Sequence, residues 1–65
     1  MNLAKSINVA TARAEMTQKE LAMKMGKHPN IISQWKAAND AKVSDITAMA
    51  EATGFEVGEF LALGD

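Results

Sequence analysis

Two short helical segments separated by only two residues constrain the fold of this 65-residue chain most strongly. In the first segment, residues 17–25, Thr17 is a suitable N-cap and Glu20 follows three positions later, which is the pattern of a capping box. Gly26 can adopt the left-handed conformation that ends a helix. The second segment, residues 28–38, then begins almost at once, so the sequence predicts two helices joined by a tight turn.

Local signals also define the second helix. Pro29 suits a first helical position, which places His28 at the cap. Ile32 and Trp35 stand three residues apart, so we expect both to face the core. Trp35 on a basic surface could instead stack on a base of a single strand, but its spacing favours the core. Asn39 can adopt the left-handed conformation and end the helix.

Three further helices are predicted around this pair. The first is indicated by apolar residues three or four positions apart, namely Leu3, Ile7, Ala10 and Ala14. Ser44 or Asp45 is expected to cap the fourth helix, and Gly54 to end it. The fifth is marked by Val57, Phe60 and Leu61. No strand or hairpin signal is present, so we expect one compact all-α domain of five helices over residues 1–65.

Composition excludes several classes of protein. The chain has no cysteine and one histidine, so neither a disulfide framework nor a zinc site is expected. Five short helices rarely enclose the pocket of ~300 Å³ that a small-molecule site needs, so we expect no enzyme activity, cofactor or ligand. No apolar run approaches the ~20 residues of a membrane span, and no signal peptide is apparent. A cytoplasmic binding domain is therefore expected.

The charges are unevenly distributed along the chain. The net charge is −1, but all seven basic residues lie in residues 1–42 together with three acids. Residues 43–65 contain five acids and no base. Such a chain can present a basic end to a polyanion, although the asymmetry is equally compatible with ordinary solvation of two faces.

At this point the sequence resembles the Cro/repressor (XRE-like) helix-turn-helix family of phage and bacterial regulators. The residues that carry the resemblance are Thr17-Gln18-Lys19-Glu20-Leu21-Ala22, Gly26 and Ile32-Ser33-Gln34-Trp35. Apolar residues and Gly54 in the last third also fall where the family places its fourth and fifth helices. The resemblance implies a five-helix, lambda-repressor-like domain that binds operator DNA as a dimer and controls transcription.

The sequence departs from the family at three positions. Thr11 stands near the place where the family usually has arginine, and Lys36 where it usually has glutamate. These family residues form an ion pair between the first and third helices. The loss of both members together indicates a coherent replacement. Glu15 occupies a position that is often glycine in the family.

Four residues of the second helix of the pair are expected to read bases. Asn30 and Gln34 are four apart and share a face, and both side chains can form paired hydrogen bonds with adenine. Ile31 either contacts a thymine methyl or fills the core. His28 can cap the helix, contact a phosphate or touch a base.

Other polar residues are expected to contact phosphates. In the family, the residue that matches Gln18 holds a phosphate, together with the free N–H groups at the start of its helix. Lys42 stands in a loop where the family often touches the DNA backbone. The full predicted set is Thr17, Gln18, Lys19, Lys27, Ser33, Lys36 and Lys42.

The expected partner is double-stranded DNA, bound by a homodimer that forms either before binding or only on the DNA. One such module cannot supply the ~4–10 kcal/mol that separates specific from non-specific binding, whereas two copies on half-sites one turn apart can. The acidic, apolar last third, which contains Phe55, Phe60, Leu61 and Leu63, is the expected source of the dimer interface. The sequence leaves open which of these four residues belong to the core and which to the contact surface. The favoured function is a Cro-like repressor of phage or prophage type. The alternatives are an antitoxin or anti-repressor-like protein-interaction module with the same fold, and a non-specific DNA binder.

Overall fold

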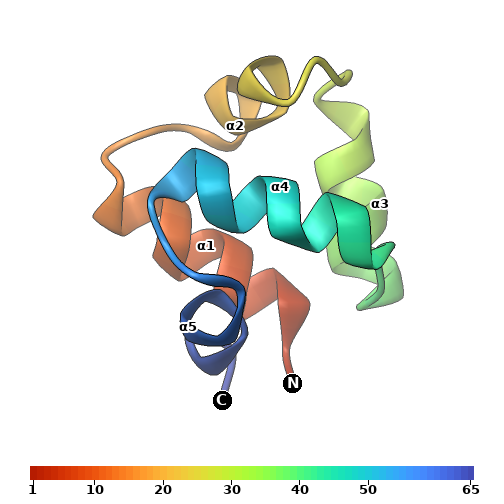
Figure 1. The fold of residues 1–65 in the computed structure, drawn as a ribbon. Helices are drawn as coiled ribbons and strands as arrows, with labels where there is room; N and C mark the ends of the chain where they lie inside the picture. Colours follow the sequence, from red (N-terminus) through yellow and green to blue (C-terminus); the bar gives the residue numbers. More distant parts are fainter.

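The structure, a computed structural model, describes residues 1–65 and contains five helices and no strand (Figure 1). The helices are α1 (Leu3–Arg13), α2 (Gln18–Lys24), α3 (Asn30–Ala38), α4 (Val43–Thr53) and α5 (Val57–Ala62). The predicted all-α, five-helix fold is thus confirmed. None of the helices is both long and apolar enough to cross a bilayer.

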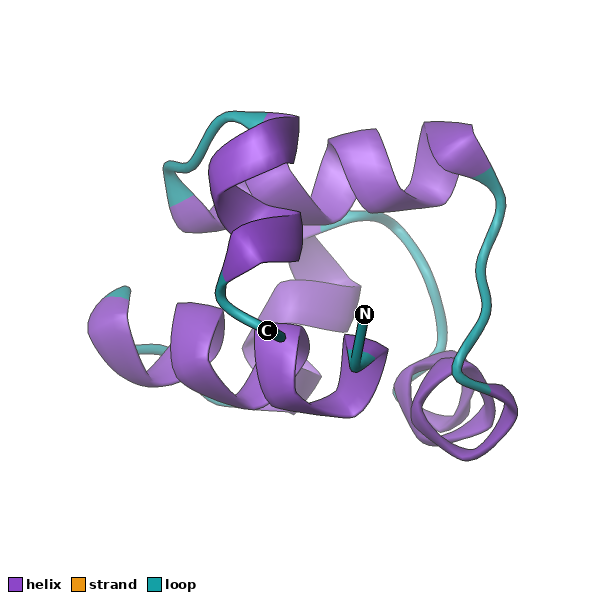
Figure 2. Ribbon diagram, turned by 90° about the horizontal axis from the view of Figure 1, so that it is seen from below, coloured by secondary structure: helices purple, strands orange, loops and turns teal.

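A single hydrophobic core receives side chains from every helix. α1 is central and packs against each of the other four helices, as Figures 1 and 2 show from two directions. The core consists of Leu3, Ile7, Ala10, Leu21, Ala22, Ile32, Trp35, Met49, Ala50 and Phe60. Ala22 is fully buried, and Trp35 is only 6% exposed, so Trp35 is a core residue as predicted.

The predicted capping box at the start of α2 is confirmed. The Thr17 hydroxyl accepts a hydrogen bond from the Glu20 N–H at 3.1 Å, and the Glu20 carboxylate accepts one from the Thr17 N–H at 3.0 Å. These two bonds, the backbone bond most strongly, hold the pKa of Glu20 below its usual value. Gly26, at φ +70°, follows the end of the helix, as its sequence position predicts.

The start of α3 differs by one residue from the prediction. The helix begins at Asn30, and Pro29 is its N-cap, although the φ of −54° at Pro29 is already helical. His28 therefore precedes the N-cap and does not occupy the predicted cap position, but its Nδ1 atom accepts a hydrogen bond from the Asn30 N–H at 3.1 Å. The side chain thereby satisfies one of the N–H groups that a helix start leaves unpaired.

The predicted cap of α4 is wrong. The helix begins at Val43 with Lys42 as N-cap, so Ser44 and Asp45 lie inside its first turn. The Ile46 N–H donates to the Lys42 carbonyl at 2.9 Å, which fixes the first turn without a capping side chain. Asp45 instead pairs its carboxylate with the Lys27 ammonium at 3.7 Å. This contact comes from the turn between α2 and α3, and no local pattern reveals it.

Residues with a left-handed backbone conformation end two of the helices and lie in one of the turns. Asn39 (φ 53°) ends α3 and Gly54 (φ 83°) ends α4, both as predicted. Glu15 also has a positive φ, of 56°, in the turn between α1 and α2. This conformation explains why the family often has glycine at this position.

The two ends of the chain lie side by side (Figures 1 and 2). The Asn2 N–H donates to the Gly64 carbonyl at 3.2 Å, and the Lys5 ammonium donates to the Asp65 carbonyl at 2.9 Å. Phe60 is fully buried in the core, which assigns it to the core of the two roles that the sequence left open for this residue.

Candidate nucleic-acid interface

The outward face of α3 is a continuous exposed strip that is polar except for Ala37. Ile32 and Trp35 point into the core, so the residues on the opposite side of the helix remain exposed. These exposed residues are Asn30, Ser33, Gln34 and Ala37. The side chains of Asn30 and Gln34 form no hydrogen bond within the protein and lie one turn apart. Their amide donors and acceptors are therefore available to a partner.

The two remaining base-contact candidates lie beside this strip. Ile31 is half-buried and packs against the core, which is the core-filling role that the sequence left open beside thymine contact. His28 is exposed. Because its Nδ1 atom accepts the hydrogen bond from Asn30, the proton of the neutral ring lies on Nε2, which is free to donate.

A three-residue polar cluster joins α1, α2 and α3. The Lys36 ammonium donates to Asn8 Oδ1 at 3.0 Å and to Gln18 Oε1 at 3.2 Å. Gln18 Nε2 also donates to Asn8 Oδ1, at 2.6 Å. We refer to these residues as the Asn8–Gln18–Lys36 cluster. It brings together Gln18 and Lys36, two predicted phosphate contacts, and adds Asn8, which the sequence analysis did not identify.

The cluster explains the departure from the family's ion pair. Thr11 is buried and donates its hydroxyl hydrogen to the Ile7 carbonyl of its own helix at 2.7 Å, and it forms no hydrogen bond with α3. The tie between α1 and α3 comes instead from Asn8, one turn earlier on α1. The coherent replacement is thus a hydrogen-bonded cluster. The lysine at a position usually occupied by glutamate was the only sequence signal for it.

The other predicted phosphate contacts are spread along the edges of α2 and α3. Lys19, Ser33 and Lys42 are exposed, and their side chains form no hydrogen bond or ion pair. Thr17 is exposed, and its hydroxyl is engaged in the capping box. Lys27 is 44% exposed but pairs with Asp45, which offsets part of its charge.

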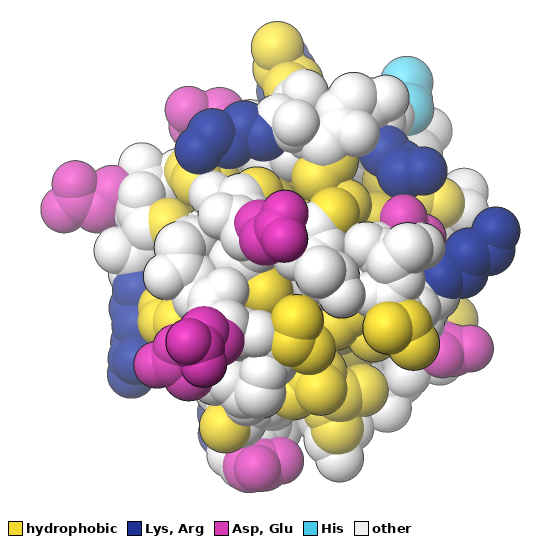
Figure 3. Space-filling model, in the orientation of Figure 1, with side chains coloured by type: hydrophobic (Ala, Val, Ile, Leu, Met, Phe, Trp, Pro, Cys, Tyr) yellow, Lys and Arg dark blue, Asp and Glu magenta, His cyan; other side chains and the backbone are white.

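The basic and acidic parts of the chain are not separated in space. Lys5, Lys24 and Lys27 all contact residues of the acidic last third; Lys24, for example, donates to the Ala52 carbonyl at 3.3 Å. In Figure 3, lysine, arginine and acidic side chains alternate around one face of the molecule. Of the two interpretations of the charge asymmetry that the sequence left open, these contacts favour ordinary solvation over a distinct basic end, because folding places the last third against the first.

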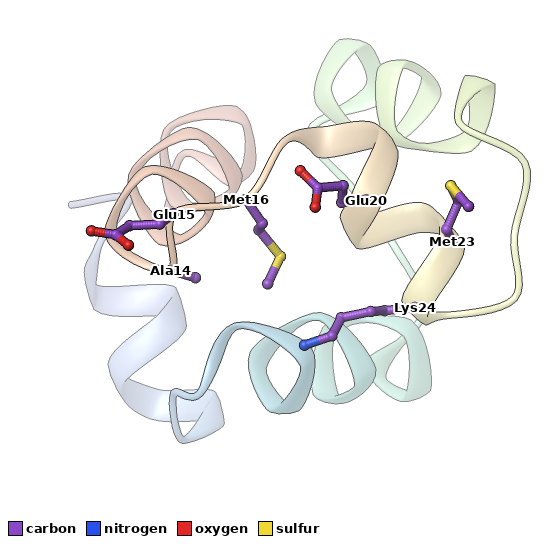
Figure 4. A pocket seen from close by; sticks show the side chains of 6 residues that line it. All are labelled: Ala14, Glu15, Met16, Glu20, Met23 and Lys24. Atoms are coloured by element: carbon purple, nitrogen blue, oxygen red, sulfur yellow. The ribbon is translucent and has the colours of Figure 1, made fainter.

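A surface hollow lies elsewhere. Figure 4 shows it between the turn after α1, the side of α2 and the nearby α4. It is lined by Ala14, Glu15, Met16, Glu20, Met23 and Lys24. None of these residues belongs to the cluster or to the exposed strip of α3, so the hollow is separate from the candidate interface.

The comparisons with known proteins agree with this geometry. A family model described as Helix-turn-helix matches residues 3–60, which include the two-helix unit and most of the helices that support it. No curated protein and no solved structure significantly matches the chain. The chain belongs to the Cro/repressor (XRE-like) helix-turn-helix family of DNA-binding transcription regulators.

Proposed function

We propose that this protein is a small Cro-like repressor of phage or prophage type, which binds an approximately palindromic operator as a homodimer. In this proposal α3 is the recognition helix and enters the major groove. The observation that carries the proposal is the exposed strip of α3, where Asn30 and Gln34 have free amide groups one turn apart.

The strip has the chemistry that base reading requires. Asparagine and glutamine amides can each pair with N6 and N7 of adenine, and each good pair discriminates by about 1–3 kcal/mol. The free Nε2 proton of His28 adds a donor near the start of α3, suited to a phosphate oxygen or to guanine N7. Ser33, within the strip, and the half-buried Lys36 beside it are suited to phosphates.

The small number of base contacts supports a dimer. A single module of this size covers about 600–1,000 Å² of DNA interface, which limits its specificity. Two modules on half-sites one helical turn apart read twice as many bases. Val43, at the start of α4, is 77% exposed, and Figure 3 shows apolar side chains gathered beside α4. Of the residues expected at the interface, Phe55, Leu61 and Leu63 are half-buried and pack against the core.

The test is selection from random duplex DNA at near-physiological salt, followed by measurement of the stoichiometry on the selected site. An inverted repeat with half-sites about one turn apart, bound by two chains, is the expected result. Binding without a motif would instead identify a non-specific DNA binder. No binding by the folded protein would overturn the proposal in favour of a protein partner.

A further inference from the structure

We propose that the Asn8–Gln18–Lys36 cluster is a single phosphate-binding site, in which Asn8 contacts the DNA backbone and Lys36 positions Gln18. The inference rests on the proposed function, because the phosphate belongs to bound DNA. It goes further by assigning a role to Asn8 and by making the three side chains act together.

The hydrogen bonds inside the cluster engage its acceptor oxygens and leave donors free. Asn8 Oδ1 accepts two hydrogen bonds and Gln18 Oε1 accepts one. An ammonium has three N–H groups and a primary amide has two. One N–H therefore remains on Lys36 Nζ, one on Gln18 Nε2 and two on Asn8 Nδ2. A group of free donors that carries one positive charge is suited to an anion.

The internal bonds also hold the donors in place before DNA arrives. Lys36 and Gln18 are half-buried, and Lys36 connects both amides. A free lysine side chain loses considerable rotamer entropy when it is ordered by a ligand. Here folding has already ordered it, so less of this cost falls on binding.

The cluster lies beside the strip that is proposed to enter the major groove. Lys36 follows Ser33 by three residues and so shares its flank of α3. Asn8 is exposed on α1 and bonded directly to Lys36. A phosphate bound here would lie at the edge of the groove, where backbone contacts fix the orientation of a recognition helix. The glutamate that the family usually has at this position would present a negative charge instead.

The variant Asn8→Asp tests the site while preserving its internal bonds. The carboxylate can accept from both Lys36 and Gln18, but it removes two donors and neutralises the cluster. We expect the thermal midpoint to be unchanged or higher. The Kd for a mixed-sequence duplex should rise by about tenfold, the magnitude of one lost charged hydrogen bond. The plot of log K against log salt should become shallower by about 0.9, which corresponds to one lost phosphate contact.

The matched control is Asn2→Asp. It is the same chemical change at the N-cap of the helix that contains Asn8. At this N-cap aspartate can also accept the hydrogen bond from the Lys5 N–H. We expect a smaller change in Kd and an unchanged salt slope. If Asn8→Asp behaves like Asn2→Asp, the cluster is not a phosphate site, although DNA binding by the wild type still stands.

A second variant covers the positioning role of Lys36. Lys36→Met keeps most of the apolar stem but removes the charge and both hydrogen bonds to the amides. Lys36→Met should reduce the salt slope, as Asn8→Asp does. The double variant Asn8→Asp, Lys36→Met should lose less binding free energy than the sum of the losses in the two single variants. Additive losses would show that the residues act independently and would overturn the proposal. Failure of the wild type to bind any duplex would overturn the proposed function itself.

Discussion

The Oδ1 atom of Asn39 accepts a hydrogen bond of 2.7 Å from the backbone N–H of Leu3, which joins the end of α3 to the start of α1. The Nδ2 atom of Asn39 also donates to the Met1 carbonyl at 3.2 Å. The backbone of Asn39 is left-handed, at φ 53°, and closes α3. One residue thus ends α3 and satisfies a backbone N–H in the first turn of α1.

Two substitutions separate these roles. Asn39→Gly keeps the left-handed backbone but loses the side-chain hydrogen bonds to Leu3 and Met1, so we expect a loss of about 0.5–1.5 kcal/mol in the free energy of unfolding. Asn39→Ala also strains the backbone and should cost about 1–2 kcal/mol more. Urea denaturation followed by the fluorescence of Trp35, the single tryptophan, measures both losses. Equal losses would show that the left-handed backbone contributes no strain in the alanine variant.

The positive φ of Glu15 predicts a stabilising substitution. The left-handed conformation of Glu15 is unfavourable for a residue with a side chain, so Glu15→Gly removes this strain from the folded state. The greater conformational entropy of glycine in the unfolded chain offsets part of this gain. We expect the free energy of unfolding to rise by up to about 1 kcal/mol. Gly26→Ala is the reciprocal control. Because Gly26 has a φ of 70°, the added side chain should lower the free energy of unfolding. A destabilised Glu15→Gly variant would contradict the prediction.

Helix ends with a local determinant could be predicted from the sequence, and those without one could not. Thr17 with Glu20, Asn39 and Gly54 were all identified correctly, because each acts on backbone within a few residues of itself. The start of α4 was missed. It has no capping side chain, and its plausible cap Asp45 pairs with Lys27 in another part of the fold.

The candidate site shows the same division. The exposed strip of α3 followed from helical periodicity, which places Asn30 and Gln34 on one face. Asn8 was missed because its partner Lys36 lies 28 residues away in the sequence. The position of Lys36 suggested that an ion pair was lost, but only the fold shows what replaced it.

The lowered pKa of Glu20 predicts a dependence of stability on pH. A carboxylate whose pKa is lower in the folded state stabilises the fold above the ordinary glutamate value near 4.5. This contribution is lost as the pH falls below that value and through the lowered pKa. We expect the urea midpoint to fall less in Glu20→Gln than in the wild type between about pH 6 and pH 3.

The control for this experiment is Glu51→Gln. Glu51 is exposed like Glu20, but its side chain, unlike that of Glu20, forms no hydrogen bond. Glu51→Gln should keep more of the wild-type pH dependence than Glu20→Gln. Identical pH profiles for these two variants would show that the capping box contributes nothing to the dependence.

Gln34→Ala should affect specificity. If Gln34 reads a base, the variant loses about 1–3 kcal/mol on the selected operator and tolerates substitution at one base pair in each half-site. Asn30→Ala should relax a different base pair, because the two residues lie one turn apart on α3. Competition binding against a panel of single-base operator variants measures both effects. An equal loss on every sequence would assign Gln34 to the DNA backbone.

Lys42→Ala should affect affinity without affecting specificity. Lys42 is exposed at the N-cap of α4, and its ammonium forms no bond within the protein, so its whole charge is available to a phosphate. We expect weaker binding to all duplexes alike, with a salt slope shallower by about 1. Lys5→Ala removes the same charge from a side chain bonded to the Asp65 carbonyl and should change the slope less. Loss of any lysine weakens the long-range attraction between the protein and DNA. The comparison of the salt slopes of these two variants therefore decides whether Lys42 contacts the DNA. Equal slopes would remove Lys42 from the interface.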